Sequence, residues 1–263
     1  MSVPLWRLII DGPVPGAMNM ALDRAVLAGR SAGSSPPTLR LYRWELPTVS
    51  LGHFQAVEQV DLEACARRGF DVVRRPTGGR GVLHDDELTY SIVASTDDGV
   101  PRGVAASYRH LSAALAAAYV RLGVSAQVTA RSRGEEGAGA CYLHSTQADL
   151  SLGAAKLSGS AQVWKDDAVL QHGCFVVSRD VDAEAEVFRL DETRRAALGK
   201  TTATLSGALG RSPSVDAIAG AVVEAVERTL GVRLVPGTFS DVERSYASDR
   251  TEEHRVYTVP RGA

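Results

Sequence analysis

Three arginines and three glycines gather in one short run of the chain, and a His-Asp pair follows them. The run reads Arg74-Arg75-Pro76-Thr77-Gly78-Gly79-Arg80-Gly81-Val82-Leu83-His84-Asp85. Glycines let backbone amides approach a ligand closely, and arginines neutralise phosphate or carboxylate groups. The spacing matches neither a Walker phosphate loop nor the Gly-x-Gly-x-x-Gly dinucleotide motif. The run therefore predicts a loop that holds an anionic or carbonyl-bearing ligand, with a wide surface loop as the competing interpretation.

A second candidate is the run Lys156-Leu157-Ser158-Gly159-Ser160-Ala161-Gln162. A lysine followed by small residues leaves room for a ligand beside an ammonium, which can polarise a carbonyl or stabilise an oxyanion. An ordinary exposed lysine at a strand end is the competing interpretation. His84 and His172 are further candidates for ligand contact or acid–base chemistry, although lone histidines are often structural.

Cys65, Cys141 and Cys174 are odd in number and far apart, so they indicate neither a disulfide framework nor a metal site. Cys141 ends a polar, glycine-rich run at 131–140 that is expected to be flexible, which makes its thiol accessible. A cation near that thiol would favour the nucleophilic thiolate. Cys174 lies among bulky apolar residues of a predicted strand, where burial would raise the pKa of its thiol, and Cys65 is expected to be buried in a helix.

The pattern of elements places these candidates between strands. The glycine-rich loop lies between predicted strands at 70–73 and 88–94, and Lys156 begins a predicted hairpin of 156–164 and 168–177. Helical spacing predicts helices at 17–29, 61–68, 107–122, 215–230 and 239–247, with a broken helical segment at 183–198. Asn19 and Asp23 lie one turn apart on the first helix, where a solvated face is favoured over a cleft.

The composition is that of an ordinary globular protein. The chain has 263 residues, 44% apolar and 23% charged, with a formal net charge of −2. This balance gives no reason to expect nucleic-acid or membrane binding. The first residues lack the features of a signal peptide, so a cytoplasmic protein is expected. The order of elements favours an α+β fold, with a single domain at 1–248 and a loose tail at 249–263.

Four runs together resemble the lipoate-protein ligase A / biotin-protein ligase catalytic superfamily. They are Met18-Asn19-Met20-Ala21-Leu22-Asp23, the glycine-rich loop, Lys156-Leu157-Ser158-Gly159-Ser160-Ala161 and Gln171-His172-Gly173. Their order and spacing agree with that family over residues 5–235. The resemblance implies a mixed, mainly antiparallel β-sheet flanked by helices, as in biotin- and lipoate-protein ligase catalytic domains. Members attach lipoyl, octanoyl or biotinyl groups to a lysine of a carrier domain.

The resemblance also implies the site. It assigns catalytic roles to Cys141 and Lys156 and no metal ligand. The residues that it places around the acyl group are Arg75, Thr77, Gly78, Gly79, Arg80, His84, Ser158, Gly159, Ser160, Ala161, His172 and Gly173.

Two chemistries occur in this family. Octanoyltransferases take the acyl group from octanoyl-acyl carrier protein onto a cysteine and require no cofactor, whereas ligases use ATP and Mg. The Thr-Gly-Gly-Arg-Gly loop, the position of Cys141 and the chain length resemble the transferase branch, although Tyr-Leu-His-Ser-Thr after Cys141 departs from its usual Phe-x-Ala-Pro-Ser. The implied acceptor is a lipoyl domain, of the glycine cleavage H protein or of a 2-oxoacid dehydrogenase E2. The ligase and a non-catalytic lipoyl-domain-binding module are the alternatives.

Overall fold

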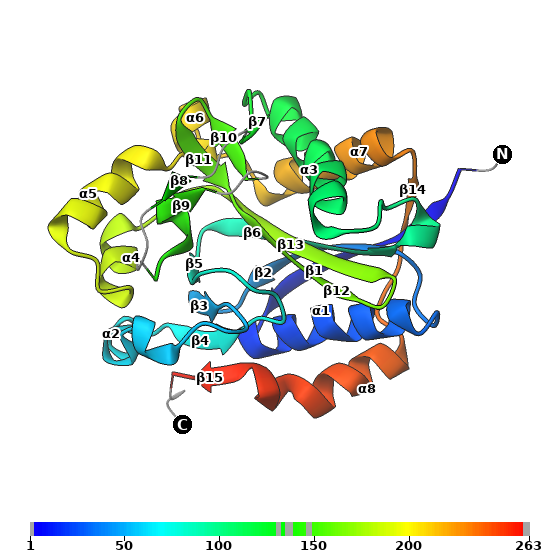
Figure 1. Cartoon of the computed structure of the whole chain (residues 1–263), viewed down its shortest axis with the longest axis horizontal. Coiled ribbons are helices and arrows are strands. Elements are labelled where there is room, and N and C mark those ends of the chain that lie inside the picture. The colour runs from blue at the N-terminus through cyan, green and yellow to red at the C-terminus, as the bar shows by residue number, and fades with distance from the viewer. Residues whose placement is uncertain (1–2, 130–132, 135–138, 146–148, 260–263) are drawn as a thin grey trace.

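The computed structural model describes residues 3–129, 133–134, 139–145 and 149–259. A six-stranded sheet runs through the centre of the molecule (Figure 1), in the order β12-β13-β6-β2-β1-β14. Its strands are β1 (Leu5–Val14), β2 (Thr38–Trp44), β6 (Glu87–Ser95), β12 (Ser160–Lys165), β13 (Ala168–Val176) and β14 (Arg233–Pro236). β1 pairs in parallel with β2 and β14, and the other pairs of this sheet are antiparallel.

The central strands are buried on both faces. All nine residues of β6 are buried, because helices cover each side of the sheet. On one side lie α3 (Val104–Arg121) and α7 (Val215–Leu230), and on the other lie α1 (Gly16–Ser31) and α8 (Asp241–Arg250) (Figure 1). Strand alternation sends Leu88, Tyr90 and Ile92 into the core beneath α3 and α7. It sends Thr89 and Ser91 toward α1, where they become available to a site.

Local signals explain where the helices begin and end. Asp61 caps α2 (Leu62–Arg68), Ser214 caps α7, and Gly69 and Gly231 end these two helices in the left-handed conformation. The remaining helices are α4 (Val181–Val187), α5 (Glu192–Thr201) and α6 (Leu205–Leu209), with short 3-10 turns η1 (Val57–Gln59), η2 (Thr96–Asp98), η3 (Cys141–Leu143) and η4 (Thr251–His254). All six predicted helical segments are confirmed, although α6 lies in a stretch that the sequence did not predict as helical.

Three smaller sheets flank the centre. They are β15-β4-β3-β5, β11-β10-β7 and β8-β9, built from β3 (Thr48–Leu51), β4 (Asp71–Arg74), β5 (Val82–His84), β7 (Gln127–Val128), β8 (Arg133–Gly134), β9 (His144–Ser145), β10 (Leu150–Leu152), β11 (Ala155–Ser158) and β15 (Arg255–Tyr257). Within the described residues the strand pairs are mostly antiparallel, so the predicted mixed, mainly antiparallel α+β fold is confirmed.

Two sequence expectations need correction. The hairpin is formed by β12 and β13, whereas Lys156 lies on β11, which pairs with β10 in another sheet. The tail expected at 249–263 is not loose over its described part, because β15 pairs with β4 and Val259 N donates to Asp71 Oδ1 at 2.9 Å. Residues 260–263 lie outside the described chain, as do 131–132 and 135–138 of the run expected to be flexible.

Among the described residues, the search for a helix of sufficient length and hydropathy to span a membrane finds none.

Candidate acyl-transfer site

A pocket opens between the glycine-rich loop and the face of the central sheet that carries Thr89. Its lining residues are Met20, Tyr42, Trp44, Ser50, Arg75, Gly79, Val82, His84, Thr89, Cys141, Tyr142, Gly159, Ser160, Ala161, His172, Gly173 and Cys174. Cys141 is half-buried and Gly79 is exposed, whereas Met20, Tyr42 and Trp44 are buried. The pocket therefore leads from a partly exposed thiol toward an aromatic and aliphatic interior, a shape suited to an alkyl chain.

The loop arginines hold the loop itself. Arg75 donates from Nη2 to the carbonyl oxygens of Gly78 and Arg80 at 2.9 and 2.8 Å, and from Nη1 to that of Ser50 at 2.9 Å. Arg74 Nη1 donates to three carbonyl oxygens of the adjoining 52–55 turn. Burial lowers the pKa of Arg75. The described bonds of Arg75 and of Arg74 Nη1 to backbone carbonyls give both arginines a structural role, and neutralisation of a ligand anion stays a prediction.

The loop also leaves no room for larger residues beside it. Gly79 adopts a φ of +95°, in the region that favours glycine. A Cβ added at Gly52 would lie 1.9 Å from the carbonyl oxygen of Gly79, so the two segments touch backbone to backbone. This contact and the arginine bonds fix one wall of the pocket.

Cys141 is held against the same loop by the backbone. Its N–H donates to the carbonyl oxygen of Gly81 at 2.8 Å, and Gly81 N–H donates to that of Gly139 at 3.0 Å. These bonds place the thiol at the pocket although residues 135–138, earlier in the same run, are not described. The position of Cys141 therefore depends on the glycine loop rather than on its own short turn, η3.

Lys156 reaches Cys141 from β11. Its Nζ lies 3.7 Å from Cys141 Sγ, 3.3 Å from the Cys141 carbonyl oxygen and 2.8 Å from Asp149 Oδ2. Burial opposes the charge of Lys156, but the negative charges of Cys141 and Asp149 outweigh it and raise the pKa of the ammonium. Lys156 is therefore a fixed cation beside the thiol. We call Cys141, Lys156 and Asp149 the thiol site.

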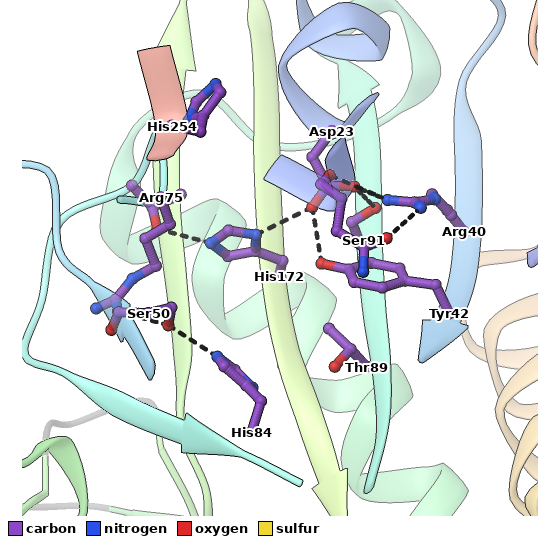
Figure 2. Close-up of polar contacts among 12 residues, drawn as sticks. Asp23, Arg40, Tyr42, Ser50, Arg75, His84, Thr89, Ser91, His172 and His254 are labelled. Carbon is purple, nitrogen blue, oxygen red and sulfur yellow. Dashed lines mark hydrogen bonds and ion pairs between the residues drawn. The ribbon is translucent and has the colours of Figure 1, made fainter. Parts of the chain in front are cut away.

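Asp23 is the centre of a buried polar network, and Asn19 is buried beside it. Arg40 Nη1, Tyr42 Oη and Ser91 Oγ donate to the Asp23 carboxylate at 3.0, 3.0 and 2.8 Å, and His172 Nδ1 lies 3.2 Å away (Figure 2). Burial tends to raise the pKa of Asp23, but His172 and Arg40 outweigh it and hold that pKa below its usual range. The predicted solvated face is wrong, because both Asn19 and Asp23 are 0% exposed.

The network reaches the glycine loop through His172. Burial lowers the pKa of His172, so its ring is neutral at pH 7. With Nδ1–H directed to Asp23, Nε2 is left to accept from Thr77 Oγ1 at 2.7 Å. Thr77 in turn offers its carbonyl oxygen to the N–H of His53 at 2.8 Å. We call Asp23, Arg40, Tyr42, Ser91, His172 and Thr77 the Asp23 network.

Residues 15–227 match the profile of the lipoyl protein ligase A/B catalytic domain, which covers most of the chain. The chain belongs to this family. It is 39% identical to an octanoyltransferase LipM of Moorella thermoacetica, with 93% of each chain covered. It is 38% identical to an octanoyltransferase LipM of Kyrpidia tusciae, over 92% of this chain and 93% of the relative.

Solved structures of the family share the fold. A lipoate-protein ligase A bound with ATP superimposes with a TM-score of 0.78, at 26% identity over 94% of each chain. A bi-partite lipoate protein ligase from Thermoplasma acidophilum, studied with its E2 lipoyl domain, gives 0.77 at 24% identity, over 95% of this chain and 93% of the other. The second likeness, at that identity, concerns the fold.

The structure brings most of the predicted site residues to one pocket. Nine of them line it, namely Cys141, Arg75, Gly79, His84, Gly159, Ser160, Ala161, His172 and Gly173. Lys156 and Thr77 reach the pocket through their contacts with Cys141 and His172. Gly78 and Arg80 supply carbonyl oxygens to Arg75, and Ser158 Oγ donates to the Cys174 carbonyl oxygen at 2.8 Å, so these three support the walls.

The sequence analysis did not identify several residues that lie in or near the pocket of this protein. Asp149, Ser50 and Glu87 stand in runs that carry no chemical signature, so no local pattern could have identified them. Arg40 did carry a signal: it lies between Leu39 and Leu41 on a strand. A cation in a strand that proves to be central must find a buried carboxylate, which is Asp23.

Proposed function

We propose that this chain is an octanoyltransferase of protein lipoylation that carries the acyl group on Cys141. The observation that carries the proposal is the Cys141–Lys156 contact of 3.7 Å at the end of a pocket with an apolar interior. The octanoyltransferase relatives, matched over nearly their whole length, support the same activity.

The first half-reaction is attack on a thioester. The Cys141 thiolate adds to the octanoyl carbonyl of octanoyl-acyl carrier protein, and the carbonyl π electrons move to oxygen. Lys156 stabilises this oxyanion and the entering thiolate through its fixed positive charge. Collapse breaks the bond to the carrier sulfur, which leaves as a thiolate and takes a proton from water.

The second half-reaction moves the acyl group to nitrogen. A neutral lysine amine of the lipoyl domain adds to the acyl-Cys141 carbonyl, and collapse expels the Cys141 thiolate again beside Lys156. The amine proton is lost to water. A thioester is reactive enough to transfer its acyl group to an amine, so the reaction consumes no nucleotide. Burial of the octanoyl methylenes contributes about 5 kcal/mol to binding, at ~0.8 kcal/mol each.

A donor assay tests the proposal. The protein is incubated with octanoyl-acyl carrier protein without ATP, and its intact mass is measured before and after a lipoyl domain is added. We expect one octanoyl adduct on Cys141 that moves to the lipoyl domain. Cys65→Ser is the matched control, because Cys65 is buried outside the pocket and the adduct should persist.

The same assay separates the alternatives. If transfer requires ATP, Mg and a free acid, the protein is a ligase and the proposal is wrong. The fold is shared with an ATP-bound lipoate-protein ligase, so this outcome is a real alternative. Binding of a lipoyl domain without transfer from either donor would leave a non-catalytic module. Either result, with no adduct on Cys141, overturns the acyl-cysteine mechanism.

A further inference from the structure

Three potential metal ligands that are not part of the thiol site meet beside the pocket. They are His84 on β5, Glu87 on β6 and Cys174 on β13, and all three are buried. Their ligand atoms lie within 4.8 Å of one another, and no other group of this kind is found in the described parts of the chain. The fold therefore gathers a nitrogen, an oxygen and a sulfur donor from three strands. We call these residues the His84 cluster.

We propose that the His84 cluster binds one divalent transition-metal ion with a preference for thiolate and imidazole, such as Zn²⁺ or Co²⁺. Cysteine sulfur, histidine nitrogen and a carboxylate are the ligand types that zinc takes in proteins. His84 and Cys174 both line the pocket, so a fourth position would open onto it. The acyl transfer proposed above does not use this metal, and the inference stands apart from it.

The spacing suits a tetrahedral ion after a small adjustment. Bonds of about 2.0–2.3 Å place tetrahedral ligand atoms about 3.3–3.8 Å apart. His84 Nδ1 and Glu87 Oε1 are now 2.7 Å apart, at hydrogen-bond distance, and must separate slightly. The third ligand atom, Cys174 Sγ, lies within 4.8 Å of the other two.

Proton movements can accompany binding without a new partner. His84 Nε2 lies 2.7 Å from Ser50 Oγ, so a proton on Nε2 can be donated there while the Nδ1 lone pair binds the metal. Cys174–SH exchanges its S–H bond for an S–metal bond and releases one proton to water. Two negative ligands, Glu87 and the Cys174 thiolate, then balance the two positive charges of the ion.

Aromatic and cationic side chains stand behind the third ligand. Tyr142 Oη lies 3.4 Å from the Cys174 sulfur, and Arg179 is stacked 3.6 Å from the centre of the Tyr142 ring.

Cobalt titration tests the proposal in a Cys141→Ser background, which removes the other thiol of the pocket. We expect one equivalent of Co²⁺ to give a sulfur-to-cobalt charge-transfer band with four-coordinate d–d bands, and at least one proton released per ion. Zn²⁺ should displace the cobalt. Trp44 stacks on His84 at 4.2 Å, so its fluorescence should change in the same titration and not in Trp44→Phe.

Variants of the cluster decide the outcome. Cys174→Ser should abolish the charge-transfer band, and Glu87→Gln should weaken binding by about 100-fold or more, since loss of even outer-shell partners costs 10–100-fold. Cys65→Ser is the matched control and should keep the band. The absence of any band in the Cys141→Ser protein, or a band that survives Cys174→Ser, overturns the proposal. Circular dichroism of each variant shows that the fold is retained.

Discussion

The thiol site and the Asp23 network both contribute residues to the lining of one pocket, and each is built around a buried ion pair. At the thiol site, Lys156 Nζ lies 2.8 Å from Asp149 but also faces Cys141, a half-buried group that can react. In the Asp23 network, Arg40 and Asp23 are hydrogen-bonded to groups that are themselves buried, with exposed fractions of 0–5% among the network's members. We therefore expect the first pair to take part in the proposed chemistry, and the second to hold the sheet, helix and loop together.

The largest expected effect comes from the thiol. Cys141→Ser should lower acyl transfer by at least about 10⁴-fold, because the nucleophile of the covalent step is lost. The free energy of unfolding should change little, since the side chain is half-buried. Transfer kinetics and urea unfolding measure the two quantities. Full transfer activity in Cys141→Ser would contradict the assignment of Cys141 as the nucleophile.

Asp23→Asn should act mainly on stability and lower the free energy of unfolding. It removes one of the two carboxylates beside the buried Arg40 and leaves Asp11 as the other, so the unfolding free energy should fall by up to about 3 kcal/mol, the lower end of the cost of a buried charge left alone. Urea unfolding measures the loss, with Asp98→Asn as a control, because the Asp98 side chain is 12% exposed and its pair with Arg30 lies nearer the surface. A loss smaller than that of the control would contradict the structural role of the network.

Lys156→Met should lower the rate of acyl-Cys141 formation by about 10²–10³-fold, as expected when one oxyanion partner is removed. Single-turnover kinetics with octanoyl-acyl carrier protein measure this step separately from release. Lys165→Met is the matched control, because Lys165 is exposed at the β12–β13 turn. An unchanged rate would mean that Lys156 has only a structural role, as Arg40 does, and the two ion pairs would then not differ in function.

The smallest effect is a pH slope. The pKa of His172 is lowered in the fold, so between that pKa and about 6.5 the unfolded state binds the extra proton and stability falls as pH falls. Burial lowers this pKa most, Asp23 opposes the shift, and Arg75 and His84 add to it. His172→Gln should flatten the decrease in unfolding free energy below pH 7 by up to about 1.4 kcal/mol per pH unit. His53→Gln, in an exposed loop, is the control, and an equal flattening there would refute the assignment.

Much of the fold could be predicted from the sequence because local signals determine it. Ser214 and Gly231 bound α7, and the apolar period within it selects the buried face. The glycine-rich loop and Cys141 were also recognisable, since unusual residue types concentrate there. Cys65 and Cys174 were predicted as buried, and the buried surroundings of both raise the pKa of their thiols, that of Cys65 to about 12.

Other features depended on contacts that no local pattern encodes. The residues after α8 were expected to be loose because they lack periodicity, yet β15 pairs with β4 from far along the chain. Arg75 lines the pocket as expected, but its hydrogen bonds to the carbonyl oxygens of Ser50, Gly78 and Arg80 could not be foreseen. A short strand or an arginine has no fixed partner in sequence, since the partner is supplied by the packing.

The sequence by itself determined the family, the elements and the identity of the candidate nucleophile, because these depend on residue types in order. Only the tertiary structure decided that Asp23 is buried, that Lys156 lies on a different sheet from the hairpin and still reaches Cys141, and that Cys174 meets His84 and Glu87. The reason is physical: burial and charge pairing arise between segments distant in the chain, and their strength depends on distances that exist only after folding.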